Sequence, residues 1–208
     1  MFLTFEGPEG SGKSSQIALL AQFLRQEGYT VLATREPGGT PIGDQIRSCL
    51  HDVANTQMTA AAEILLYSAS RAQLVHEVIR PALVAGKVVL CDRFADSTIA
   101  YQGYGRGLEL DALMRITRFA TGGLTPDLTF LLDIDVERGL ARRLEGGQEM
   151  NRLDLETVAF HQKVRQGYFQ LAAADPKRWH VVDADRPVEV VQAELRQAAL
   201  VRLTRGVS

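Results

Sequence analysis

The chain has 208 residues, of which 46% are hydrophobic, and it carries 23 basic against 25 acidic side chains. This length predicts one domain spanning residues 1–208, and the near-balance of charge gives no reason to expect a nucleic acid or a membrane as partner. Two cysteines, Cys49 and Cys91, are too few for a disulfide framework, and no apolar run approaches the ~20 residues that span a bilayer. No basic region precedes an apolar stretch at the N-terminus. We therefore expect a soluble, cytoplasmic protein.

Short apolar runs alternate with longer segments of helical periodicity along the whole chain. The expected strands are residues 2–5, 30–33, 88–91, 128–132 and 180–182. The expected helices are residues 13–27, 41–52, 60–85, 110–121, 136–144, 156–173 and 187–203. Continuously apolar strands that alternate with helices are typical of a doubly wound α/β fold, so we predict a five-stranded parallel sheet with helices on both faces.

The first expected strand runs directly into a glycine-rich loop. Residues 7–14 read Gly-Pro-Glu-Gly-Ser-Gly-Lys-Ser, and a helical pattern follows at once. In this strand–loop–helix context the motif predicts a P-loop, in which backbone N–H groups and a helix N-terminus cradle a phosphate. Lys13 would reach the β- and γ-phosphates of ATP, and Ser14 would ligate Mg²⁺. The predicted ATP-binding residues are Gly7, Pro8, Glu9, Gly10, Ser11, Gly12, Lys13 and Ser14.

Two acidic residues are expected in or near this loop, and the role of each has to be explained because the loop binds an anion. Asp92 ends the apolar strand at residues 88–91, which is the usual place of a second carboxylate that contacts Mg²⁺, commonly through water. Glu9 lies inside an anion-binding loop, where a carboxylate should repel a nucleotide. Glu9 is either a solvated loop residue or points away from ATP toward a second substrate.

A second group of polar residues follows the other expected strands or lies on the expected helices. Arg35 to Thr40 leave the second strand, and Tyr67 and Arg71 lie four residues apart on one helix face. Each of these has an ordinary explanation as a core or surface residue. Their joint placement beside a P-loop matters, because strand ends of an open α/β sheet converge on one crevice.

At this point the sequence resembles the thymidylate kinase family. The resemblance is carried by Thr-Arg-Glu-Pro-Gly-Gly-Thr at residues 34–40 and by Asp-Arg-Phe-Ala-Asp-Ser-Thr-Ile-Ala-Tyr-Gln-Gly at residues 92–103. Further matching segments are residues 5–14, 66–71, 125–133 and 151–154. The resemblance implies transfer of a phosphoryl group from ATP to dTMP, with Mg²⁺ as cofactor, and a homodimer to which residues 41–52 and 60–85 contribute.

The resemblance also implies a role for individual residues of the acceptor site. The base would be held by Tyr67, Arg71, Thr98 and Gln102, the deoxyribose by Tyr101, and the phosphate by Arg47 and Arg93. Glu9 would lie near the 3′-hydroxyl and the acceptor phosphate, and Glu36 near the metal and the acceptor side. An aromatic face with arginine suits a planar base, and arginine forks suit phosphate oxygens. Position 67 usually carries phenylalanine in the family, and a tyrosine ring can stack in the same way.

The polar segment at residues 142–154 is either an ordinary surface loop or a short mobile lid. Because the P-loop holds Glu9 where a cation could stand, positive charge for catalysis must come from elsewhere. The resemblance is to the bacterial form of the family, whose lid carries a catalytic arginine. We therefore expect Arg152 to act in catalysis together with Lys13, Glu9 and Arg93, and Arg142 and Arg143 to contact ATP.

Two other functions remain open from the residues alone. A kinase for another nucleotide, or for a nucleoside with Glu36 as general base, would share the P-loop. A nucleotide switch would require Asn-Lys-x-Asp to read guanine, whereas residues 151–154 have arginine in place of lysine.

Overall fold

The computed structural model describes residues 1–146 and 150–205 of the chain. Its five strands form one sheet in the order β2-β3-β1-β4-β5, and every neighbouring pair is parallel. The strands are β1 (Phe2–Glu6), β2 (Val31–Arg35), β3 (Val88–Asp92), β4 (Leu128–Asp133) and β5 (Trp179–Asp183). This confirms the predicted α/β fold with a five-stranded parallel sheet.

The central strands are buried on both faces, which explains why their sequences are continuously apolar. Side chains alternate between the two faces along each strand. Leu3 and Phe5 of β1 pack with Leu20 and Leu24 on one face, whereas Phe2 belongs to a separate cluster on the other.

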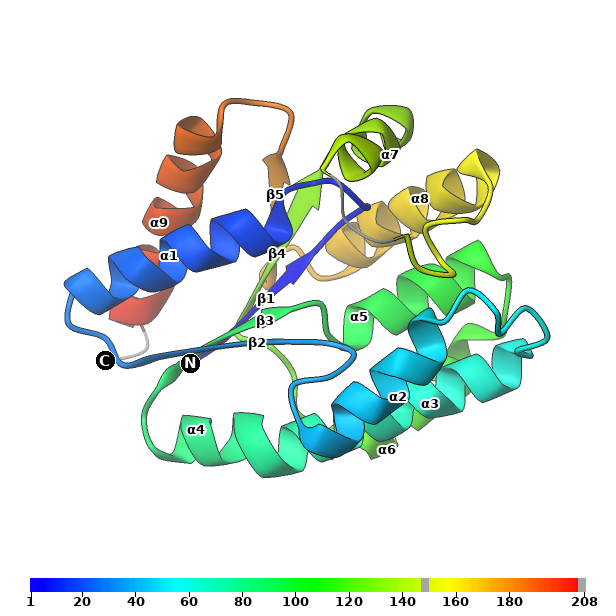
Figure 1. Ribbon diagram of the computed structural model, residues 1–208. Helices are drawn as coiled ribbons and strands as arrows, with labels where there is room; N and C mark the ends of the chain where they lie inside the picture. The colour runs from blue at the N-terminus through cyan, green and yellow to red at the C-terminus, as the bar shows by residue number, and fades with distance from the viewer. Residues whose placement is uncertain (147–149, 206–208) are drawn as a thin grey trace.

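Helices cover both faces of the sheet (Figure 1). One face is covered by α1 (Lys13–Gln26) and α9 (Val188–Arg205), whose apolar residues join the first cluster. The remaining helical elements are α2 (Pro41–His51), α3 (Ala60–Leu74), η1 (Val75–Ile79), α4 (Arg80–Val84), α5 (Ala95–Thr98), η2 (Ile99–Gly105), α6 (Leu110–Thr121), α7 (Val136–Glu145) and α8 (Val158–Ala174). Within the described residues, no helix is both long enough and apolar enough to cross a membrane.

Two helical regions differ from the sequence prediction. The helix expected over residues 60–85 is interrupted by the π-helical turn η1, just before Pro81, which has no N–H to donate to the preceding turn. Residues 95–105 are helical as α5 and η2, where no helix was predicted. Gly103 and Gly105 weaken the helical signal there, and tertiary packing against α8 outweighs it.

The carboxyl ends of all five strands lie at one edge of the sheet. The P-loop follows β1, Arg35 and Asp92 end β2 and β3, and the segments after β4 and β5 lead to α7 and α9. Because the strands are parallel, residues that are far apart in the sequence lie together at the same edge of the sheet. Cys91 is buried as predicted, Cys49 is exposed, and both thiols are free.

Candidate active site

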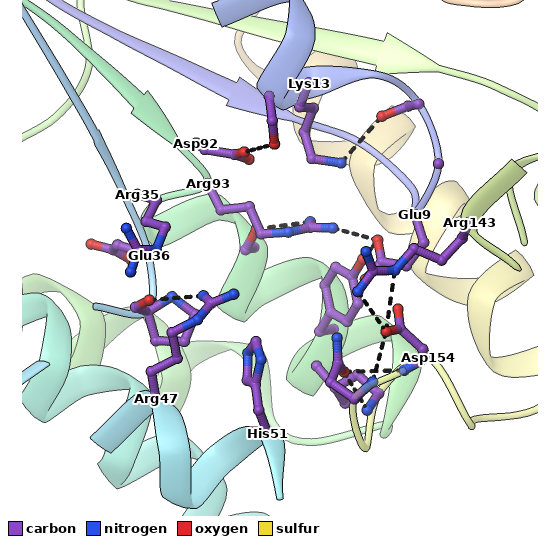
Figure 2. Close-up of a pocket in the computed structure, with 18 of the residues that line it drawn as sticks. Glu9, Lys13, Arg35, Glu36, Arg47, His51, Asp92, Arg93, Arg143 and Asp154 are labelled. Carbon is purple, nitrogen blue, oxygen red and sulfur yellow. Dashed lines mark hydrogen bonds and ion pairs between the residues drawn. The ribbon is translucent and has the colours of Figure 1, made fainter. Parts of the chain in front are cut away.

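A cavity of about 370 Å³ lies at this edge of the sheet. Most residues that the sequence predicts for the site line it, and so do residues that it did not single out. The predicted residues in the lining are Glu9, Gly10, Ser11, Gly12, Lys13, Ser14, Glu36, Arg47, Tyr67, Arg71, Asp92, Arg93, Thr98, Tyr101, Gln102, Arg142 and Arg143. The donor and acceptor sides predicted from sequence thus open into one space, which Figure 2 shows with charged groups converging from several elements.

The P-loop packs tightly against the start of α7, and this contact requires glycine. Gly10 has a φ of 69°, and a Cβ built on it would lie 1.9 Å from the carbonyl oxygen of Gly139. Gly7 has a φ of 136°, and its Cβ would lie 2.3 Å from the carbonyl oxygen of Leu132. Both positions combine a backbone conformation that favours glycine with no room for a side chain. The loop is therefore fixed by β4 and α7 before any ligand binds.

Lys13 lies at the N-terminus of α1 with its ammonium group against the loop. Its Nζ donates to the carbonyl oxygens of Pro8 (2.8 Å) and Gly7 (3.1 Å) and to Ser11 Oγ (3.1 Å). Burial, followed by repulsion from the Arg93 guanidinium, lowers the pKa of Lys13 to about 8. Gly7 and Pro8 stand behind the cavity lining and contribute carbonyls to this lysine.

Ser14 and Asp92 form an oxygen pair beside the loop. Ser14 Oγ donates to Asp92 Oδ2 at 2.8 Å, joining the first turn of α1 to the end of β3. A hydroxyl and a carboxylate at this spacing suit a small hard cation, which takes its other ligands from water and phosphate oxygens. The pair therefore fits Mg²⁺, although it contains fewer protein ligands than an all-protein metal cage.

Glu9 points toward Arg93 and Tyr101, on the predicted acceptor side of the cavity. It forms an ion pair with Arg93, and its Oε2 accepts a hydrogen bond from Tyr101 Oη at 2.8 Å (Figure 2). Burial alone would raise the pKa of Glu9, but Arg93 and then Lys13 outweigh it, and the pKa is lowered. Of the two sequence interpretations, the geometry favours the one in which Glu9 faces a second substrate.

Arg93 is held in an unusual backbone conformation at the end of β3. Its φ is 65°, and its NH1 donates to Gly7 O and to Tyr168 Oη at 3.1 and 3.0 Å. Its guanidinium lies over the Tyr101 ring at 5.0 Å. Burial opposes the charge, but Glu9 and Tyr101 outweigh it, so the pKa of Arg93 is raised well above its usual value. The guanidinium is therefore a fixed cation between the P-loop and the acceptor side.

Glu6, at the end of β1, supports the backbone that carries Arg93. Its Oε1 accepts from Phe94 N at 2.8 Å, and its Oε2 accepts from Ser97 Oγ at 2.6 Å and Tyr168 Oη at 2.9 Å. Burial, and then the nearby Asp96 carboxylate, raises the pKa of Glu6 to about 7.

Arg71 is completely enclosed on the base side, with 1% of its surface exposed. Its Nε donates to Glu36 Oε2 (2.8 Å), NH1 to Thr98 Oγ1 (2.9 Å) and NH2 to Phe94 O (3.0 Å). The buried pair with Glu36 compensates both charges. Glu36 thus orients Arg71 through its Oε2, whereas its Oε1 has no hydrogen-bond partner among the described residues, so this contact does not decide between an orienting role and a role as general base.

Arg47 extends from α2 toward the same cavity, and its NH1 donates to Pro37 O at 2.9 Å. His51 lies one turn further along α2, and Figure 2 shows both side chains pointing into the cavity. Burial, followed by the charge of Arg47, lowers the pKa of His51 to about 4, so the imidazole is neutral at physiological pH.

The three arginines expected to act from the lid have different surroundings. Arg142 forms an ion pair with Asp185 (2.9 Å), and Arg143 forms one with Asp154 (3.0 Å). The structure does not bring Arg152 into the cavity, because its guanidinium forms an ion pair with Glu63 and lines a separate surface hollow. The catalytic role of Arg152 stays a prediction. Residues 147–149, in the middle of the predicted lid, lie outside the described residues.

Some residues of the site were missed by the sequence interpretation. Arg35, His51 and Ser97 line the cavity, and Glu6 and Tyr168 hold Arg93 from behind. Arg35 and Ser97 lay inside motifs that the sequence singled out. Tyr168 carries no local signal, because it belongs to the ordinary apolar pattern of α8.

The parallel sheet, the P-loop between β1 and α1 and the arginine-rich acceptor side together define a P-loop kinase of the nucleoside monophosphate type.

Comparison with known proteins agrees with this class. A sequence description of the family "Thymidylate kinase" matches residues 5–195. The chain is 52% identical to a thymidylate kinase of Geotalea uraniireducens, with 99% of both chains aligned, and 53% identical to one of Deinococcus radiodurans, with 94% of both aligned. The crystal structure of thymidylate kinase from Ehrlichia chaffeensis superimposes with a TM-score of 0.79 at 33% identity, covering 96% of this chain and 98% of that one. The chain belongs to the thymidylate kinase family.

Proposed function

We propose that this protein transfers the γ-phosphoryl group of ATP to dTMP, giving ADP and dTDP. The observation that carries the proposal is the shared cavity, in which a complete P-loop faces an acceptor pocket lined by an aromatic ring and by arginines, of which Arg71 is buried. The family supports both substrates, because the similar chains are named thymidylate kinase.

The P-loop side would bind the polyphosphate of ATP. Backbone N–H groups of the loop and the N-terminus of α1 favour negative charge, and the Lys13 ammonium is close enough to exchange its loop carbonyls for phosphate oxygens. Ser14 and Asp92 would hold Mg²⁺, which when bound neutralises part of the charge on the phosphates.

The opposite side would bind dTMP. The Tyr67 ring offers a face for the base, while Arg71, Thr98 and Gln102 supply buried polar groups for its edge. Such groups discriminate strongly, because a base with the wrong hydrogen-bonding pattern leaves them unpaired. Arg47 and Arg93 would hold the monophosphate between the base pocket and the P-loop.

This arrangement needs no general base. The nucleophile is an oxygen of the dTMP phosphate, which is already ionised at neutral pH, so catalysis consists of positioning and charge neutralisation. Arg93 and Lys13 would stabilise the transferring group from either side. We infer that Glu9, through its contacts with Arg93 and Tyr101, keeps the acceptor phosphate and sugar in line with ATP.

The lid segment at residues 142–154 would complete the site by adding cations and excluding water. Arg143 lines the cavity, and Arg142 donates to Ala184 O on the segment after β5, which the family resemblance implies lies near the adenine. Arg152 would have to leave Glu63 to reach the transferring phosphoryl group.

The homodimer remains a prediction from the resemblance, and the cytoplasmic location remains a prediction from the cysteine content and hydropathy of the sequence. The dimer is supported by apolar side chains that stay exposed on neighbouring helices. These are Ile42 of α2, Leu65 of α3 and Met114 and Phe119 of α6, the last being 90% exposed.

The test is release of ADP from ATP and Mg²⁺ with dTMP, dUMP, dCMP, AMP, thymidine or no acceptor. Strong turnover with dTMP, and weaker turnover with dUMP, is the expected result. Turnover on thymidine in place of dTMP would support the nucleoside kinase. ADP release that no acceptor stimulates would refute the proposal and favour a nucleotide switch.

A further inference from the structure

Glu63 is a buried carboxylate directly behind the base pocket, and the mechanism above does not use it. It lies on α3 one turn before Tyr67, and 1% of its side chain is exposed. Four donors converge on its two oxygens. Arg106 donates twice, to Oε1 at 2.8 Å and to Oε2 at 3.0 Å, Gln102 Nε2 donates to Oε1 at 2.8 Å, and Arg152 forms an ion pair with Oε2.

The contact with Gln102 has a consequence for the base pocket. A carboxamide has one donor end and one acceptor end, whereas an ionised carboxylate can only accept. Burial would raise the pKa of Glu63, but the hydrogen bonds from Arg106 and Gln102 outweigh it, and the carboxylate stays ionised. Gln102 must therefore turn its Nε2 toward Glu63, and its Oε1 is left for the cavity that the side chain lines.

We propose that Glu63 is a specificity-determining positioning residue, which locks the Gln102 carboxamide so that only its oxygen faces the base. The proposal rests on the proposed function. An oxygen acceptor at this place pairs with the N3–H donor of thymine or uracil. Cytosine carries an acceptor at N3, so the same oxygen would meet a lone pair and the complex would lose a buried hydrogen bond.

The surrounding charges explain why the residue that orients Gln102 is a carboxylate. Arg106 and Arg152 both form ion pairs with Glu63, so its negative charge is compensated without help from Gln102, while Arg106 also pairs with Glu156 at 2.9 Å. Gln102 therefore does not need to compensate the charge of Glu63, and its orientation is set by hydrogen bonding alone. A neutral amide at position 63 could both donate and accept, so it would allow either orientation of Gln102.

The test compares kcat/KM for dTMP and dCMP in the wild type and in Glu63→Gln. The expected result is that the dTMP:dCMP ratio falls at least about tenfold, chiefly through a higher KM for dTMP, with a smaller change in kcat. Glu156→Gln is the matched control, because it removes a carboxylate from Arg106 without touching Gln102 and should leave the ratio unchanged. Glu63→Asp keeps the charge but is too short to hold both Arg106 and Gln102, so it should also lower the ratio.

A double-mutant cycle separates this role from a purely structural one. Gln102→Leu should lower the ratio by itself, and adding Glu63→Gln should lower it no further. The proposal is overturned if both Glu63 variants keep the wild-type ratio, or if Glu63→Gln lowers it equally with and without Gln102. Failure of the proposed function would be distinguishable, because the wild type would then show no turnover of dTMP.

Discussion

The donor and acceptor sides of the cavity are built in different ways. The P-loop side consists of eight consecutive residues whose backbone forms the binding surface, fixed by close contacts of Gly7 and Gly10 with β4 and α7. The acceptor side is made of side chains from α2, α3, the segment after β3, α5 and η2, held by hydrogen bonds to one another. One side depends on local backbone geometry, and the other depends on the correct packing of distant elements.

The two sides also differ in how their charges are compensated. On the acceptor side, the buried Arg71 and the partly buried Arg93 and Arg106 each have a carboxylate partner, which is Glu36, Glu9 and Glu63 respectively. Lys13 instead donates to neutral loop oxygens, and it forms no ion pair with a carboxylate among the described residues. Removing one partner of these ion pairs should therefore cost stability as well as activity, whereas removing Lys13 should cost activity with little loss of stability.

The largest effect is expected from Arg71→Met. It leaves the Glu36 carboxylate buried without its cation, which should lower the free energy of unfolding by about 3–5 kcal/mol. Urea unfolding followed by circular dichroism measures this. The double variant Glu36→Gln/Arg71→Met should recover part of the loss, because no charge is left buried. A single variant as stable as the wild type would contradict the pairing.

Lys13→Ala should affect activity instead. Removing the cation that we propose faces the transferring phosphoryl group should lower kcat/KM by roughly 10²–10³-fold, with little change in the unfolding midpoint. Steady-state ADP release and thermal unfolding on the same preparation test both parts. A strong loss of stability with modest loss of activity would show that the contrast between the two sides is wrong.

Glu6→Gln should change how stability depends on pH. Because burial and Asp96 raise the pKa of Glu6 from 4.5 to about 7, its protonated form stabilises the fold fully below pH 4.5, and this contribution is lost as pH rises to 7. Glutamine cannot ionise, so the variant should gain on the order of 2–3 kcal/mol relative to the wild type between pH 4.5 and pH 7.5. Parallel unfolding curves at the two pH values provide the measurement. If the stability difference between the variant and the wild type is the same at both pH values, Glu6 is ionised throughout this pH range.

The smallest effect concerns the lid. If Arg152 leaves Glu63 during turnover, Arg152→Ala should lower kcat about tenfold with little change in the KM for dTMP. Arg138→Ala is a suitable control, since this exposed arginine of α7 pairs with Asp185 outside the cavity lining. An unchanged kcat would remove Arg152 from the mechanism and leave it a structural partner of Glu63.

The difference between local backbone geometry and the packing of distant elements also explains what could be predicted from the sequence. The P-loop, the strands and the parallel sheet follow from consecutive residues and their spacing, and the structure confirms the fold. The helical segment at residues 95–105 was missed because its two glycines and its polar residues obscure the pattern. Glu63 and Tyr168 gave no local signal, because each acts through contacts with residues more than 35 positions away.

The central claim is phosphoryl transfer from ATP to dTMP, and the most direct test follows the phosphorus atom. The protein would be incubated with Mg²⁺, dTMP and ATP labelled in the γ-phosphate, and the nucleotides separated. The account predicts that label appears as the β-phosphate of dTDP in equal amount to the ADP formed. Label released as inorganic phosphate, with no labelled dTDP, would contradict it.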